Sequence, residues 1–277
     1  MQEWYHRWAT SLGDFEETPE KAWGTEKYDP EKHIDEKVVF CGLYGLPDFY
    51  ALWRHKGRKS IFWCGSDISH FINGYWLDDE GHIKINPEQL ARWIEENCDS
   101  YVENQREADV LRKFGISSKI VPSFFGLIRN YPLSYQYSDR PKVYASVSGD
   151  DFDRYCWNDI DRLASENPDI DFYLYGNSVP WNSPNDNVFV RGRVSKEQMN
   201  EEIKNMQGAL RPLYFDGFSE VLAKSVLWGQ WPISRIPYPH MLSIEEIGTL
   251  KDKKEPNIEG RKYYKKNINK YPWKAQK

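Results

Sequence analysis

The chain has 277 residues, 40% of them hydrophobic, and a net charge of only -5. This composition predicts a globular protein with one large or two medium domains, and the charge gives no reason to expect nucleic-acid binding. No apolar run is long enough to span a bilayer, and residues 1–10 lack the apolar centre of a signal peptide, so we expect a cytoplasmic protein. The four cysteines form no Cys-x-x-Cys pair, which indicates neither a zinc site nor a disulfide framework.

The first part of the chain alternates between apolar runs and helical patterns. Trp4, Tyr5 and Trp8 have helical spacing and predict a short helix, followed by a loop to residue 35. Strands are expected at 37–42, 59–64, 99–103 and 119–122, helices at 47–55, 86–98 and 106–114, and a hairpin or loop at 74–84. The segment 37–64 is a βαβ unit with parallel strands, so Asp67 and His70, just after its second strand, are expected at the edge where ligands bind.

A polar, aromatic segment bracketed by prolines separates this part from a second βαβ series. Strands are predicted at 143–147, 170–176 and 187–192, and helices at 157–166 and 196–206. We therefore expect a first Rossmann-like domain at 1–130, a linker at 131–141, a second Rossmann-like domain at 142–250 and a basic, aromatic C-terminal segment at 251–277.

The segment 208–234 predicts a turn that leads into a helix. Gly217 can adopt backbone angles that a side chain would forbid, Ser219 is a good N-cap for a helix at 220–228, and Gly229 ends it. The spacing puts an apolar stripe on one side of this helix and the pair Glu220 and Lys224 on a polar side. The N-terminus of such a helix favours a phosphate, because its first amides are unpaired and its dipole is positive there.

The order of residues in this segment resembles the donor site of a known enzyme family. The segment is similar to the donor-site segment of family 4 retaining glycosyltransferases. The similarity lies in Leu210-Arg211-Pro212, in Asp216-Gly217-Phe218-Ser219 and in the run from Ala223 to Ile233. The resemblance implies the GT-B fold, which is α/β with two Rossmann-like open parallel-sheet domains and the ligand cleft between them. In that family two acids stand with seven residues between them. Asp216 occupies the first position, but Lys224 occupies the second, where the family has the acid that holds the ribose.

The resemblance also implies roles for individual residues. Asp216 would contact the donor sugar, Arg211 would neutralise the leaving phosphate, and Asp67 or His70 would orient the acceptor hydroxyl. The donor nucleotide would be held by Gly149, Arg154, Gly217, Phe218, Ser219, Glu220 and Lys224. Because a lysine donates hydrogen bonds but accepts none, either Glu220 holds the ribose in its place or the donor site has drifted. The leaving phosphate would assist deprotonation of the acceptor, so no side-chain nucleophile and no metal are expected.

The resemblance implies transfer of a sugar, with retention, from a UDP- or GDP-sugar to a hydroxyl of a glycan or lipid-linked acceptor. The reaction would serve glycan or polysaccharide synthesis and would need no further cofactor.

Two alternative functions stay open. A degenerate GT-B protein that acts as a sugar-binding, nucleotide-binding or partner module would explain Lys224 and the single basic residue, Arg154, in the first loop of the second domain. A metal-dependent GT-A transferase would use an Asp-x-Asp triplet, of which the chain has two, at 151–153 and 169–171.

Residues 251–277 carry ten Lys and Arg against three acids, with tyrosines between them. Such a segment favours peripheral contact with an anionic inner membrane surface, since each basic residue close to it contributes roughly 1 kcal/mol. The alternative is the solvated outer face of a final helix that returns to the first domain, as in GT-B proteins.

Overall fold

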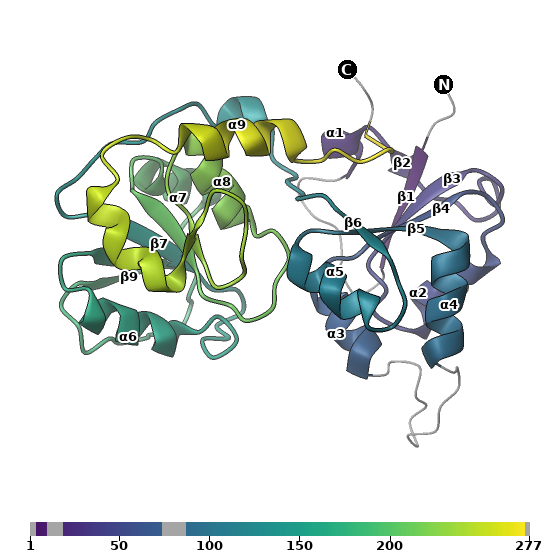
Figure 1. Ribbon diagram of the computed structural model, residues 1–277, viewed down its shortest axis with the longest axis horizontal. Helices are drawn as coiled ribbons and strands as arrows, with labels where there is room; N and C mark the ends of the chain where they lie inside the picture. The colour runs from purple at the N-terminus through teal and green to yellow at the C-terminus, as the bar shows by residue number, and fades with distance from the viewer. Residues whose placement is uncertain (1–3, 10–18, 74–86, 275–277) are drawn as a thin grey trace. The chain divides into compact units, whose positions relative to one another are not determined.

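The computed structural model describes residues 4–9, 19–73 and 87–274, and the chain divides into two compact units (Figure 1). The first unit comprises residues 1–127 together with 267–277, and the second comprises 128–266. Each contains a six-stranded sheet in which every strand pairing is parallel. The fold therefore consists of two Rossmann-like α/β domains, as the sequence predicts. The hairpin or loop expected at 74–84 lies outside the described residues.

The sheet of the first unit has the strand order β2-β1-β3-β4-β5-β6. Its strands are β1 (Trp4–Trp8), β2 (Glu26–Lys27), β3 (Lys37–Cys41), β4 (Lys59–Phe62), β5 (Cys98–Val102) and β6 (Ser118–Ile120). Its helices are α1 (Pro19–Trp23), α2 (Leu46–Arg54), α3 (Ser66–Asn73), α4 (Pro87–Asn97) and α5 (Gln105–Arg112). The predicted strands and helices between residues 37 and 122 are confirmed, with ends shifted by up to a few residues, and α3 is an addition that the sequence analysis did not predict.

The helix predicted around Trp4 and Trp8 is wrong, because these residues form strand β1. All five residues of β1 pair in parallel register with β3, from Trp4 beside Lys37 to Trp8 beside Cys41. Aromatic side chains suit a pleated, half-buried surface, and pairing with a buried neighbouring strand overrides a short helical spacing. His6, in the middle of β1, is buried and its Nδ1 lies 3.1 Å from the hydroxyl of Thr25.

Residues after Asn267 complete the first unit. Asn269 accepts a hydrogen bond from the amide of Phe124 at 3.0 Å, and the hydroxyl of Tyr271 donates to the carbonyl of Val121 at 2.8 Å. Tyr271 and Trp273 stack on each other with their ring centroids 4.5 Å apart. Both are buried in one hydrophobic cluster with Trp23, Val39, Cys41, Phe62 and Tyr101.

The sheet of the second unit has the strand order β12-β11-β10-β7-β8-β9. Its strands are β7 (Lys142–Ser146), β8 (Asp171–Tyr175), β9 (Val188–Gly192), β10 (Gly208–Arg211), β11 (Ile233–Ser234) and β12 (Leu242–Ser243). Its helices are α6 (Trp157–Glu166), α7 (Lys196–Ile203), α8 (Glu220–Trp228) and α9 (Ile258–Asn267), with 3-10 helices η2 (Ile128–Asn130) and η3 (Ile244–Asp252). Residues 131–141 contain no strand or helix and are grouped with this unit.

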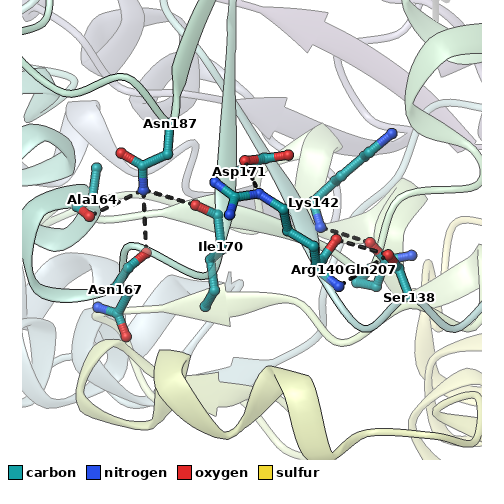
Figure 2. A network of polar contacts seen from close by, with 9 residues as sticks. All are labelled: Ser138, Arg140, Lys142, Ala164, Asn167, Ile170, Asp171, Asn187 and Gln207. Atoms are coloured by element: carbon teal, nitrogen blue, oxygen red, sulfur yellow. Dashed lines mark hydrogen bonds and ion pairs between the residues drawn. The ribbon is translucent and has the colours of Figure 1, made fainter.

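Side chains at the amino edge of the second sheet bond to the backbone and to one another (Figure 2). The buried amide of Asn187 donates from Nδ2 to the carbonyls of Ala164 and Asn167, at the end of α6, and of Ile170, just before β8, at 3.1, 3.2 and 2.8 Å. Arg140 Nε lies 2.7 Å from Asp171 Oδ1. These contacts fix where the strands of this unit begin.

Candidate functional site

The loop between β10 and α8 brings two of the predicted site residues into direct contact. Arg211 is the last residue of β10, and its Nε donates to Asp216 Oδ2 at 2.7 Å. The guanidinium lies 4.8 Å from the ring centroid of Tyr155, which comes from the loop after β7. The side chains of Arg211 and Asp216 are 12% and 24% exposed, so the pair is held at the surface and is not sealed in the core.

The helix that follows has the capping that the sequence predicts. Ser219 accepts a hydrogen bond from the amide of Leu222 at 3.5 Å, and Gly229 ends the helix with φ of 83°. The expectation for Gly217 is wrong, because its φ is not positive, and its carbonyl instead accepts a 2.7 Å bond from the hydroxyl of Tyr238. Phe218 is buried and stacks on Tyr264 of α9 with the ring centroids 5.0 Å apart, which anchors the loop before α8 in the core.

The prediction of a polar face on α8 is also wrong, since every residue from Val221 to Trp228 is buried. The side chain of Lys224 is only 7% exposed, and its Nζ lies 2.8 Å from Glu220 Oε1. The side chain of Glu220 is 53% exposed, and Lys196 of α7 approaches the same oxygen at 3.9 Å. Lys224 is thus a buried ammonium whose charge is balanced by an exposed carboxylate one turn earlier.

The loop after β7 contains the other predicted donor-binding residues. Gly149 has φ of 66° and an added Cβ would meet no atom within 4 Å, so its left-handed backbone, and not space, favours glycine there. Asp150 follows with φ of 55° and accepts a hydrogen bond from the amide of Ser178 at 2.6 Å. Arg154 is exposed, and its amide donates to Asp151 at 3.2 Å.

The Asp-x-Asp triplets do not form the site of a GT-A enzyme. Asp153 accepts from the side chain of Asn158, Asp151 accepts from the backbone of its own turn, and Asp171 pairs with Arg140 at the amino edge of the sheet. A GT-A chain would form one continuous domain, whereas this chain forms two units with a sheet each. The GT-A alternative is therefore not favoured.

Asp67 and His70 lie in the first unit, in helix α3 after β4. Asp67 is fully buried, and its carboxyl group accepts backbone hydrogen bonds from Leu43, Cys64 and Ile68 at 3.0, 3.0 and 2.9 Å. Burial raises the pKa of Asp67 to about 7, although these bonds oppose the shift. The geometry is that of a cap that ties the ends of β3 and β4 to α3. His70 is exposed, and its ring packs edge-on against Tyr44 at 5.5 Å.

The predicted residues thus fall into groups. Arg211, Asp216, Phe218, Ser219 and Glu220 lie along the β10–α8 loop, with Lys224 one turn further on, while Gly149 and Arg154 lie in the β7–α6 loop. Arg235 was not predicted as a site residue, although it follows β11 just as Arg211 ends β10. Its only signal in the sequence is its place directly after the segment 208–234, because β11 has just two residues, Ile233–Ser234.

The chain matches no family model and no curated protein sequence. Its structure is similar to sucrose-phosphate synthase from Thermosynechococcus elongatus, with a TM-score of 0.56 and 14% identity over 84% of this chain and 69% of that one. It is similar to WaaG, a glycosyltransferase involved in lipopolysaccharide biosynthesis, with a TM-score of 0.51 and 12% identity over 88% and 76% of the two chains. It is also similar to Anabaena HepE in complex with UDP-glucose, with a TM-score of 0.50 and 8% identity over 96% and 95%.

The fold is the GT-B fold. At these identities the likeness establishes the architecture and leaves the chemistry to be argued from the residues. The chain spans 50% of TarM, another solved structure that it resembles. Among the described residues, no helix has both the length and the apolar composition needed to cross a bilayer.

Proposed function

We propose that the protein is a glycosyltransferase that moves a sugar, with retention, from a UDP- or GDP-sugar to a hydroxyl of a glycan or lipid-linked acceptor in glycan or polysaccharide synthesis. The observation that carries the proposal is the β10–α8 loop, where Arg211 and Asp216 stand beside the capped N-terminus of α8 at the carboxyl edge of a parallel sheet. The GT-B fold, shared with a glycosyltransferase and with a protein solved with UDP-glucose, supports it.

The basic and acidic residues of the site have different roles in this proposal. Breaking the bond between the anomeric carbon and the diphosphate places negative charge on the leaving phosphate, which Arg211 and the first amides of α8 stabilise. Asp216 accepts hydrogen bonds from hydroxyls of the donor sugar, and Glu220, fixed by Lys224, accepts from the ribose.

The proposal is tested by incubating the protein with UDP, GDP and ADP sugars and measuring both thermal stabilisation and release of nucleoside diphosphate. Asp216→Asn is expected to reduce transfer by about a hundredfold or more while the protein stays folded. Asp171→Asn is the matched control, because Asp171 also pairs with an arginine at 2.7 Å but at the opposite edge of the sheet. Equal activity of wild type and Asp216→Asn would overturn the assignment, and binding without transfer would favour a binding module.

We further propose that the protein works at an anionic cytoplasmic membrane surface, contacted through lysines of residues 251–266. Lys251, Lys254, Lys262, Lys265 and Lys266 are exposed. Of the aromatic side chains between residues 251 and 274, Tyr264, Tyr271 and Trp273 are buried and Tyr263 is half-buried, so the lysines provide most of the exposed surface. The contact is therefore electrostatic and should weaken steeply with salt.

A further inference from the structure

Two arginines leave adjacent strands of the second sheet at the same edge. Strands β10 and β11 run parallel, and their register places Arg211 beside Ser234, so Arg235 lies one residue beyond. The amide of Arg235 points to the carbonyl of Arg211 at 3.4 Å. Because ligands of open parallel sheets bind at the carboxyl ends of the strands, both side chains begin where a ligand is expected.

The two guanidinium groups are held in the same way. Arg235 donates from Nη2 to Asp159 Oδ2 at 2.6 Å and from Nε to the carbonyl of Pro212 at 2.8 Å, and it lies 4.0 Å from the ring centroid of Tyr214. Arg211 has its own carboxylate, Asp216, and its own tyrosine ring. A guanidinium held by a ring and a carboxylate is already ordered, so little entropy is lost when it binds an anion.

Both arginines keep hydrogen-bond donors unused. Within the described residues, Nη1 and Nη2 of Arg211 and Nη1 of Arg235 make no hydrogen bond. Their side chains are only 12% and 19% exposed, but none of these three nitrogens is a fully buried atom, so the donors are open to solvent and to a ligand. Both guanidinium groups also lie at the start of α6, because Arg211 packs on Tyr155 and Arg235 bonds to Asp159, four residues further along the chain.

We propose that Arg235 is a second phosphate-binding residue, which acts together with Arg211 on the diphosphate of the donor. The inference rests on the proposed function and adds to it the cation that the β7–α6 loop lacks. Two guanidinium groups at one edge of the sheet suit two linked phosphates, because Arg211 can donate from Nη1 and Nη2 to one phosphate group and Arg235 can donate from Nη1 to the other. Asp159 and Asp216 keep the arginines in place before the donor arrives.

Calorimetric titration with inorganic pyrophosphate, UDP and UMP tests the pair. Arg235→Gln is expected to raise the Kd for pyrophosphate and UDP at least tenfold, and the Kd for UMP by less, since one phosphate engages one arginine. Arg140→Gln is the matched control, because Arg140 pairs with Asp171 at the amino edge, and its Kd values should equal those of wild type. Arg235→Lys keeps the charge without the planar guanidinium that Asp159 and Pro212 hold in place, and should weaken pyrophosphate binding several-fold.

The outcomes separate this inference from the proposed function. Unchanged pyrophosphate binding by Arg235→Gln, or no pyrophosphate binding by wild type, overturns the role of Arg235, and sugar transfer that survives the substitution leaves the function standing. Pyrophosphate binding that depends on Arg235, without transfer from any nucleotide sugar, supports the inference and overturns the function. Should Arg235→Gln fail to fold, Arg235→Lys decides, and wild-type Kd values in that variant contradict the proposal.

Discussion

The two edges of the second sheet use polar side chains in opposite ways. At the amino edge, Asn187 distributes its amide among three carbonyls, and Arg140 pairs with Asp171 (Figure 2). At the carboxyl edge, Arg211 and Arg235 are each tied to a carboxylate yet keep donors for another partner. Strands β8 and β9 thus begin in contacts that hold the fold, whereas β10 and β11 end at arginines that keep hydrogen-bond donors for a ligand. Substitutions at the amino edge should therefore change the free energy of unfolding, and substitutions at the carboxyl edge should change ligand binding.

The largest effect on stability is expected at the amino edge. Asn187→Ala removes three hydrogen bonds and leaves buried carbonyls without this donor, so it should lower the free energy of unfolding by about 2–4 kcal/mol. Urea unfolding measures the loss, and Asn158→Ala, an exposed asparagine on the same helix that Asn187 braces, is the control. A loss below about 0.5 kcal/mol would show that the amino edge is not the structural edge.

A smaller, pH-dependent effect is expected in the first unit, where Asp67 lies at a carboxyl edge but is enclosed. Its pKa is raised to about 7 by burial, above the ordinary value that it has in the unfolded chain. Between these values the folded protein binds more protons than the unfolded chain, so stability is lost as the pH rises towards 7. Wild type should lose about 2–3 kcal/mol relative to Asp67→Asn between pH 5 and 7.5, as measured by urea unfolding at each pH. If the difference in free energy of unfolding between wild type and Asp67→Asn stays constant with pH, the raised pKa of Asp67 is contradicted.

The smallest effects on stability are expected at the start of α8, where substitutions of Glu220 and of Lys224 should have unequal effects. Glu220→Gln leaves the buried ammonium of Lys224 without its charged partner and should cost about 1–2 kcal/mol. Lys224→Met removes that ammonium and leaves an exposed carboxylate in water, so the change should stay within about 1 kcal/mol. Thermal unfolding of both variants and of the double variant measures the asymmetry. Equal losses of stability in the two single variants would show that Glu220 does not balance a buried charge on Lys224.

Much of the fold could be predicted because its signals are local. The helix at 157–166 and the helix at 220–228 with its caps, Ser219 and Gly229, coincide with α6 and α8. Strand β1 could not be predicted, because its conformation depends on pairing with β3, about thirty residues later in the chain. Local spacing carries no information about such a partner.

The candidate site could be predicted in part, from the order of residues between Arg211 and Ser219. Its contacts could not. Nothing in the sequence shows that Arg211 pairs with Asp216, that Lys224 is buried, or that Arg235 emerges beside Arg211. The first depends on the path of one loop, the second on how α8 packs, and the third on which strands are neighbours, and all three are set by the packing of the whole unit.

The return of residues 269–273 to the first unit has a consequence for biosynthesis. Asn269 bonds to Phe124 across 145 residues of sequence, and Tyr271 and Trp273 fill the cluster around Trp23. During synthesis the first unit therefore cannot complete its core until the whole second unit has been synthesised. Part of that core stays uncovered in the meantime. A nascent chain stalled before residue 269 would expose aromatic surface and require protection by a chaperone.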